Sequence, residues 1–149
     1  MTNNLPPRVV RLRGLSILEL TAVVAILLAL ISVLFIGCRA WKRGSDRASC
    51  VLALRNVQVA TRSYQNLYGY HYGGRPYAEN GTQDIAEHLH SKGYIEDGLY
   101  QQARGATTCE AGGSYSRVLP DIFPPAGQLY LSCSLSGPEL HLPISHADW

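Results

Sequence analysis

The most prominent feature of the hydropathy pattern is an unbroken apolar run at residues 15–37. The run has 23 residues, and Glu19 is its only charged side chain. About 20 apolar residues in a helix, each rising 1.5 Å, are enough to cross the ~30 Å hydrocarbon core of a bilayer. Because the run is apolar on every side, it does not have the pattern of an amphipathic surface helix. The pattern therefore predicts a membrane-spanning helix.

Three other interpretations of this run are weaker. A secretory signal peptide has a shorter apolar region, of ~7–15 residues, and a small-x-small cleavage site after it, which is missing here. A lipoprotein acylated at Cys38 prefers small residues before the cysteine, whereas residues 34–36 are Leu, Phe and Ile. A buried core helix would need more chain than residues 69–149 to enclose it.

Beyond residue 38 the apolar positions change to the spacing of a one-sided helix. Steps of three or four residues separate Val51, Leu54, Val57, Thr61, Tyr64 and Tyr68. Arg55 and Arg62 fall on other faces of such a helix. The helix is therefore predicted to continue as an amphipathic segment to about residue 68. The helix is least stable near Gly44, where a bend is expected. The glycines and proline of residues 69–76 are predicted to end it.

The remaining residues predict a small C-terminal α/β head. One short helix and three strand-like segments are expected, at residues 83–92, 114–119, 128–134 and 139–142. Thr82 is in position to cap the helix and Gly93 to stop it. The first two strands are bridged by prolines and a glycine, which favours a short antiparallel hairpin. The predicted class is α+β, with a long N-terminal α-helix followed by this head.

Charge is divided unevenly along the chain, although the formal net charge is only +2. Residues 1–14 hold three arginines and no acid, and residues 39–68 hold six basic residues and one acid. Residues 69–149 hold four basic and nine acidic residues. This asymmetry suggests that the basic stem of one chain faces the acidic head of another. The acidic head argues against phosphate recognition, so no direct nucleic-acid partner is expected.

Glu19 needs an explanation, because a carboxylate at a bilayer centre costs roughly 2.5–3.5 kcal/mol. One explanation is that it lies about 6 Å from the start of the apolar run and reaches the membrane surface. The other comes from the residues before it, Arg13-Gly14-Leu15-Ser16-Ile17-Leu18-Glu19. This segment resembles the class III signal of type IV pilins and type II secretion pseudopilins. That signal has a basic leader, a glycine before the cut, and an apolar helix with Glu at the fifth mature residue.

The resemblance implies that prepilin peptidase cuts between Gly14 and Leu15 and that the new Leu15 amine is methylated. In filaments of this family, Glu19 of one subunit would pair with the amine of a neighbouring subunit. Such a pair is worth more in low-dielectric surroundings than on a protein surface. Two positions depart from the common pattern. Leu15 stands where Phe is commoner, and Ile36 stands where many members have a helix-kinking Pro.

The resemblance also implies an organisation in four segments. They are a cleaved leader at 1–14, a transmembrane and polymerisation helix at 15–38, an amphipathic continuation at 39–68, and a head at 69–149. The chain would cross the bacterial cytoplasmic (inner) membrane once, with its N-terminus cytoplasmic and its head periplasmic. The leader motif determines this orientation, because basic residues flank both ends of the span.

By the same resemblance the protein would be a structural subunit of a type II secretion pseudopilus or a type IV pilus-like filament. Its partners would be prepilin peptidase, other pilin or pseudopilin subunits, the inner-membrane assembly platform and membrane lipid. The alternative is a single-pass, signal-anchored periplasmic binding protein that does not polymerise. The chain has no recognisable nucleophile or phosphate-binding motif, so an enzyme is not expected.

The head contains a second, shorter resemblance. Cys109-Glu110-Ala111-Gly112-Gly113-Ser114-Tyr115, followed by Cys133-Ser134, is similar to Cys-Pro-x-Gly-Gly-x-Tyr…Cys-Ser in some bacterial pseudopilin-like heads. A Cys109–Cys133 disulfide is expected in an oxidising compartment, and two separate buried thiols are the alternative. Cys38 and Cys50 are expected to be packing residues.

No metal or cofactor is expected from the sequence. The four cysteines contain no Cys-x-x-Cys pair, which argues against a structural zinc site. Residues 96–98 resemble a fragment of a calcium loop but lack its alternating acidic ligands. His88 and His90 would point to different sides of a helix, and the five histidines are expected at the surface or in loops.

Overall fold

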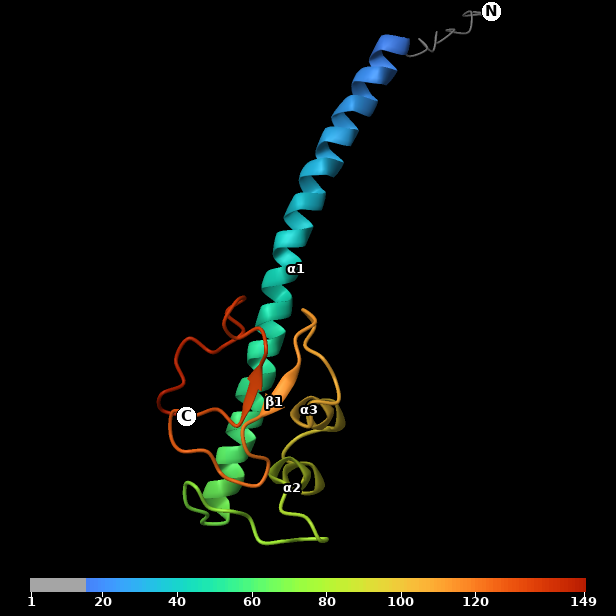
Figure 1. The fold of residues 1–149 in the computed structure, drawn as a ribbon. Coiled ribbons are helices and arrows are strands. Elements are labelled where there is room, and N and C mark those ends of the chain that lie inside the picture. Colours follow the sequence, from blue (N-terminus) through green and yellow to red (C-terminus); the bar gives the residue numbers. More distant parts are fainter. Residues whose placement is uncertain (1–15) are drawn as a thin grey trace, which may run out of the picture. The chain divides into compact units, whose positions relative to one another are not determined.

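The computed structural model describes residues 16–149 (Figure 1). Its elements are α1 (Ile17–Leu67), α2 (Ile85–Ser91), α3 (Asp97–Ala103), β1 (Tyr115–Arg117) and β2 (Leu131–Cys133). A long helix followed by short helices and an antiparallel hairpin is compatible with the predicted α+β class. The chain divides into two compact units, with the boundary after Ala40.

The first unit contains the apolar part of α1. The large side chains from Ile17 to Ile36 are exposed to solvent. By length and composition α1 is long and apolar enough to cross a membrane, a criterion that a signal sequence also meets. The helix starts with a capping box. The Glu19 N–H donates to Ser16 Oγ and the Ser16 N–H donates to Glu19 Oε2, each at a distance of 3.2 Å.

The second unit is built on the remaining part of α1. The predicted apolar stripe is buried at Leu54, Val57, Thr61 and Tyr64, which confirms its central part. The stripe packs into the core formed by α2, α3 and the hairpin, which lie around this part of α1 in Figure 1. The helix ends at Leu67, and Gly69 follows with φ +70°, a left-handed conformation that favours glycine.

The short helices differ in two ways from the sequence expectation. Asp84 rather than Thr82 caps α2, because Asp84 Oδ1 accepts the Ala86 N–H at 2.9 Å. The Thr82 hydroxyl oxygen instead accepts the Asp84 N–H at 3.1 Å. Helix α3 was not predicted. Only Ala103 of that helix is fully buried, so its sequence has little helical periodicity.

The hairpin confirms two of the three expected strands. Strands β1 and β2 are antiparallel, with Tyr115 opposite Cys133 and Arg117 opposite Leu131. The third expected strand, at residues 139–142, is wrong. Leu140 has φ +56°, which is incompatible with an extended strand, and the segment has an irregular backbone.

Two polar side chains of α1, one buried and one half-buried, hold the irregular parts of the head. Gln58 donates to the Gln128 carbonyl oxygen at 3.2 Å and accepts the Tyr130 N–H at 2.8 Å. Arg62 donates to the carbonyl oxygens of Pro124 (2.6 Å), Pro125 (2.8 Å) and Trp149 (2.9 Å). Loops without a backbone ladder are thus anchored by helix side chains.

These contacts change the interpretation of the basic stem. Arg62 is bound to its own head, and the Arg55 guanidinium lies 5.6 Å from the centre of the Trp149 ring. Two of the stem cations therefore have partners within the same chain. A charge reversal at Arg62 would disrupt the head itself. Its effect on assembly would therefore not separate a lost contact between subunits from a misfolded head.

Arg62→Met is expected to lower the free energy of unfolding of the head by about 3 kcal/mol, because it leaves three carbonyl oxygens without their charged donor. The matched control is Arg55→Met, which removes a cation–π contact worth about 0.5–1 kcal/mol. Urea unfolding of the full chain in detergent, followed by near-ultraviolet circular dichroism, measures both. Equal losses in the two variants would contradict the anchoring role of Arg62.

Candidate functional site

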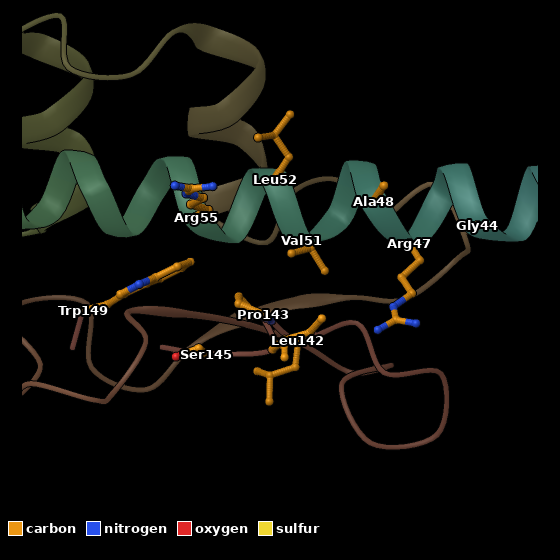
Figure 2. Close-up of a pocket in the computed structure, with 11 residues that line it drawn as sticks. Gly44, Arg47, Ala48, Val51, Leu52, Arg55, Leu142, Pro143, Ser145 and Trp149 are labelled. Carbon is orange, nitrogen blue, oxygen red and sulfur yellow. The ribbon is translucent and has the colours of Figure 1, made fainter. Parts of the chain in front are cut away.

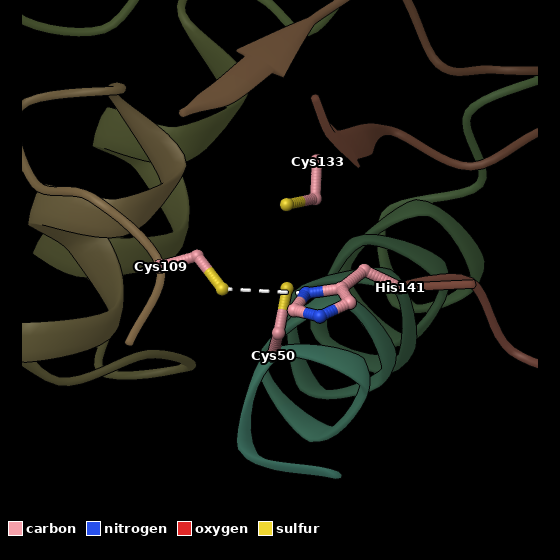
Figure 3. A group of neighbouring side chains, drawn as sticks. All are labelled: Cys50, Cys109, Cys133 and His141. Carbon is pink, nitrogen blue, oxygen red and sulfur yellow. Dashed lines mark hydrogen bonds between the residues drawn. The ribbon is translucent and has the colours of Figure 1, made fainter. Parts of the chain in front are cut away.

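Four buried side chains that can bind metal meet in the head (Figure 3). They are Cys50, Cys109, Cys133 and His141, hereafter the thiol–imidazole cluster. One ligand atom from each lies within 4.8 Å of all the others. Each residue is at most 2% exposed. Figure 3 shows the three sulfur atoms and the imidazole ring pointing toward one another from four separate segments.

The helix and the hairpin supply two of these side chains. Cys50 lies one turn before Leu54 on the buried stripe of α1. Cys133 is the last residue of β2, where it pairs with Tyr115 of β1. The alternation of the strand turns both Leu131 and Cys133 toward the core, and Ser132 between them is less buried. The same packing that builds the core therefore brings these two sulfur atoms together.

A tight turn positions the third sulfur. The Cys109 N–H donates to the Gly113 carbonyl oxygen at 2.6 Å, and the Gly112 N–H donates to the Cys109 carbonyl oxygen at 2.7 Å. Gly112 has φ +87°, which favours glycine. A Cβ atom on Gly113 would lie 2.9 Å from Cys133 Sγ and 2.8 Å from Leu135 Cγ. Both glycines of the Gly-Gly motif are thus required by the geometry around the cluster.

The fourth member, His141, has a partner on each ring nitrogen. Its Nδ1 atom lies 3.4 Å from Cys109 Sγ, and its Nε2 atom lies 3.6 Å from Glu139 Oε2. The His141 N–H donates to the Leu135 carbonyl oxygen at 3.2 Å. Leu140, between Glu139 and His141, has a left-handed backbone conformation with φ +56°. The ring is therefore placed between a sulfur atom inside the core and a carboxylate at the surface.

The surroundings disfavour a negative charge on the sulfur of Cys50. Burial raises the pKa of the Cys50 thiol. The neighbouring Cys109 and Cys133 raise this pKa further, whereas a hydrogen bond from Tyr115 lowers it. Burial also raises the pKa of the Tyr115 phenol. Reactive cysteines need a lowered pKa and access to solvent, so this cluster is not suited to nucleophilic catalysis. It is suited to holding a cation that compensates thiolate charge.

Sequence reasoning missed this grouping. Cys50 was expected to be a packing residue, and it does lie in the core. His141 was expected at the surface or in a loop; it lies in an irregular segment but is only 1% exposed. His88 is also buried, because its ring stacks on Tyr64 with centroids 6.0 Å apart. A search for a Cys-x-x-Cys pair does not find this grouping, because its four members come from distant segments of the chain. The only local signal was the Gly-Gly pair after Cys109.

The predicted disulfide involves two members of the cluster. Within residues 16–149, Cys109 and Cys133 are both free thiols. Their sulfur atoms lie within 4.8 Å of each other, as do those of Cys50 and either of them. A bridge between Cys109 and Cys133 therefore stays a prediction for the oxidised protein.

A second feature of the head is an open groove between α1 and the segment 142–149 (Figure 2). Its volume is about 550 Å³. Apolar walls come from Val51 and Leu52 on the helix and from Leu142 on the opposite side, and Trp149 closes one end. Ile144, at the rim, is 98% exposed. The only charged residues that line the groove within the described chain are arginines, which suits binding rather than acid–base chemistry.

The residues predicted for processing and assembly belong to the N-terminal end of the chain. Gly14 and Leu15 lie outside the described residues, so cleavage and methylation there stay predictions. Glu19 lies in the first turn of α1, where it completes the capping box with Ser16. Its role in filament assembly also stays a prediction. No family model, curated protein or solved structure matches the chain.

Proposed function

We propose that this protein is a pilin-like structural subunit that is processed by prepilin peptidase between Gly14 and Leu15 and assembled into a filament. The observation that carries the proposal is the position of one carboxylate, Glu19, in the first turn of an otherwise apolar helix, five residues after an Arg-flanked glycine. The exposed apolar half of α1 and the small head that follows it support the same function.

The apolar part of α1 would serve in two environments. Before assembly it crosses the inner membrane once, with the N-terminus in the cytoplasm and the head in the periplasm. In the filament, the same side chains pack against helices of other subunits. Lipid tails are as apolar as Leu or Ile, so this exchange is driven by close packing and by polar pairs rather than by the hydrophobic effect.

Glu19 would supply the polar pair that sets the register between subunits. In the capping box only Oε2 of Glu19 accepts a hydrogen bond from the described chain. The carboxylate would accept a further hydrogen bond from a neighbouring subunit, such as one from the new amine of Leu15. A subunit that enters out of register leaves this carboxylate unpaired among apolar side chains, which is unfavourable.

The small head favours a secretion-type pseudopilus over an adhesive pilus, because adhesive pilins commonly have long variable heads. The subunit would contribute surfaces, and the assembly machinery would supply the energy. Its partners would be prepilin peptidase, other pilin-like subunits and the inner-membrane assembly platform.

A second function is favoured by the groove between α1 and residues 142–149. Its apolar walls and volume of about 550 Å³ would suit a periplasmic binding protein that is merely anchored by its N-terminal helix. In that case Glu19 would act only as a helix cap. The two functions differ in the fate of residues 1–14 and in the effect of neutralising Glu19.

The first test is the N-terminus of the mature chain. In bacteria with an active prepilin peptidase, intact-mass and N-terminal peptide analysis should find Leu15 as the first residue, with one added methyl group. Gly14→Val should retain the leader, because a β-branched side chain prevents close approach of the protease to the backbone. Gly37→Val is the control and should be processed normally. A wild-type chain that keeps residues 1–14 would favour the anchored binding protein.

The second test separates the charge of Glu19 from its capping role. Glu19→Gln keeps a side chain that completes a capping box but removes the charge. Ser16→Ala removes the cap, at a cost of about 1 kcal/mol, but keeps the charge. In cells with the assembly system, we expect Glu19→Gln to lower the yield of sheared filaments about tenfold or more, equivalent to about 1.4 kcal/mol. Ser16→Ala should lower it less than about twofold. Normal yield from Glu19→Gln would argue against subunit pairing through this carboxylate.

A further inference from the structure

We propose that the thiol–imidazole cluster is a structural zinc site, in which the sulfur atoms of Cys50, Cys109 and Cys133 and Nδ1 of His141 bind one Zn²⁺. The site would join α1, the hairpin and the segment after it through a single ion. This inference is independent of filament assembly, since all four ligands lie in the head and in the part of α1 that it covers.

The donor set is the first argument. Three thiolates and one imidazole form one of the usual ligand sets of four-coordinate structural zinc. The four residues are buried and point toward a common centre (Figure 3). Softer thiolate ligands select zinc over calcium or magnesium, which require oxygen. Within the described chain, the cluster offers three sulfur donors and one imidazole, with no carboxylate among them.

The spacing is the second argument. Zn–S bonds of about 2.3 Å and Zn–N bonds of about 2.0–2.1 Å place tetrahedral ligands about 3.8 Å apart for two sulfurs and about 3.6 Å for sulfur and nitrogen. Cys109 Sγ and His141 Nδ1 are already 3.4 Å apart. The widest spacing in the cluster is at most 4.8 Å, so closing it around an ion needs a contraction of about 1 Å. Small side-chain rotations provide a movement of that size.

The third argument is the carboxylate behind the histidine. Histidines that bind metal through one ring nitrogen usually donate the other N–H to a carboxylate or carbonyl oxygen. Nε2 of His141 lies 3.6 Å from Glu139 Oε2, on the side of the ring away from the sulfurs. A carboxylate on this side of the ring favours the tautomer with hydrogen on Nε2, and that tautomer leaves Nδ1 available to zinc. A merely packed histidine would not need this arrangement.

The charges around the cluster also fit an ion. Three thiols lose their protons to solvent when they bind Zn²⁺, and with a neutral imidazole the complex carries a net charge of −1. Arg43 and Arg47 line a pocket of about 320 Å³ together with Glu139 and His141. The arginines place positive charge beside the complex, and the pocket reaches the histidine from the solvent.

Zinc accounts for more of the cluster than a disulfide does. A Cys109–Cys133 bridge would use two of the three thiols and leave Cys50 and Nδ1 of His141 buried beside it. A zinc ion uses all four groups. The two states exclude each other, because a disulfide sulfur does not provide a thiolate ligand. A head with a two-stranded sheet and short helices has a small core, and a metal is one of the devices that stabilise such folds.

The test is the metal content of the full chain, purified in detergent with a non-thiol reductant and without chelator. Elemental analysis should find one zinc ion per chain in the wild type. Cys109→Ser and Cys133→Ser should each lose most of the zinc, whereas Cys38→Ser should keep it, because Cys38 is exposed and outside the cluster. Cobalt loaded in place of zinc should show tetrahedral ligand-field bands and thiolate charge-transfer bands.

A milder variant distinguishes weaker zinc binding from loss of zinc through unfolding of the head. Glu139→Gln keeps every ligand and changes one partly exposed side chain. It should weaken zinc affinity about 10–100-fold, measured by competition with a chromogenic chelator, with an unchanged far-ultraviolet spectrum. Two results would overturn the proposal. One is wild-type protein that holds no zinc, whether a second preparation made without reductant shows a Cys109–Cys133 disulfide or free thiols in its peptide map. The other is full zinc retention in the Cys109→Ser and Cys133→Ser variants.

Discussion

The head depends on packing against one face of α1. A two-stranded hairpin and helices of seven residues do not bury enough apolar surface by themselves to be stable. The stripe that includes Leu54, Val57 and Tyr64 supplies the missing face of the core. Tyr64 is completely buried, and the rings of Tyr68, Tyr70, Tyr94 and Phe123 have centroids within 6.0 Å of its own. The helix is thus the central element of the head.

Polar groups on the same helix determine how the irregular segments are held. The loops around Pro124 and Tyr130 lie outside the two-stranded ladder, and their buried backbone groups need hydrogen bonds. Gln58 and Arg62 provide these bonds from α1. Such contacts have direction, unlike apolar packing, so they select one arrangement of the loops. The position of the segment that ends at Trp149 follows from this selection.

The parts of this fold that were predictable from sequence are those with a local signal. The first half of α1 was predicted from its continuous apolar run, its second half from apolar steps of three or four residues, and the two strands from the prolines and glycine between them. Helix α3 buries only Ala103 fully and has no such signal. The expected strand at 139–142 was wrong because Leu140 adopts a left-handed conformation, which leucine rarely does.

The two candidate sites also differ in whether a local sequence motif marks them. A local motif was sufficient to predict Gly14, Leu15 and Glu19 as processing and assembly residues, and those predictions still await experiment. The thiol–imidazole cluster has no local motif, because its members come from α1, a turn, a strand and an irregular segment. Burial of His141 depends on where that last segment folds back onto the core, which only the tertiary structure shows.

The capping box at the start of α1 has one further consequence. Ser16 and Glu19 satisfy each other's backbone N–H groups, so the first turn is closed by residues within the helix itself. Nothing upstream of Ser16 is needed for that closure. Proteolytic scission immediately before Leu15 would therefore leave both hydrogen bonds of this closure in place.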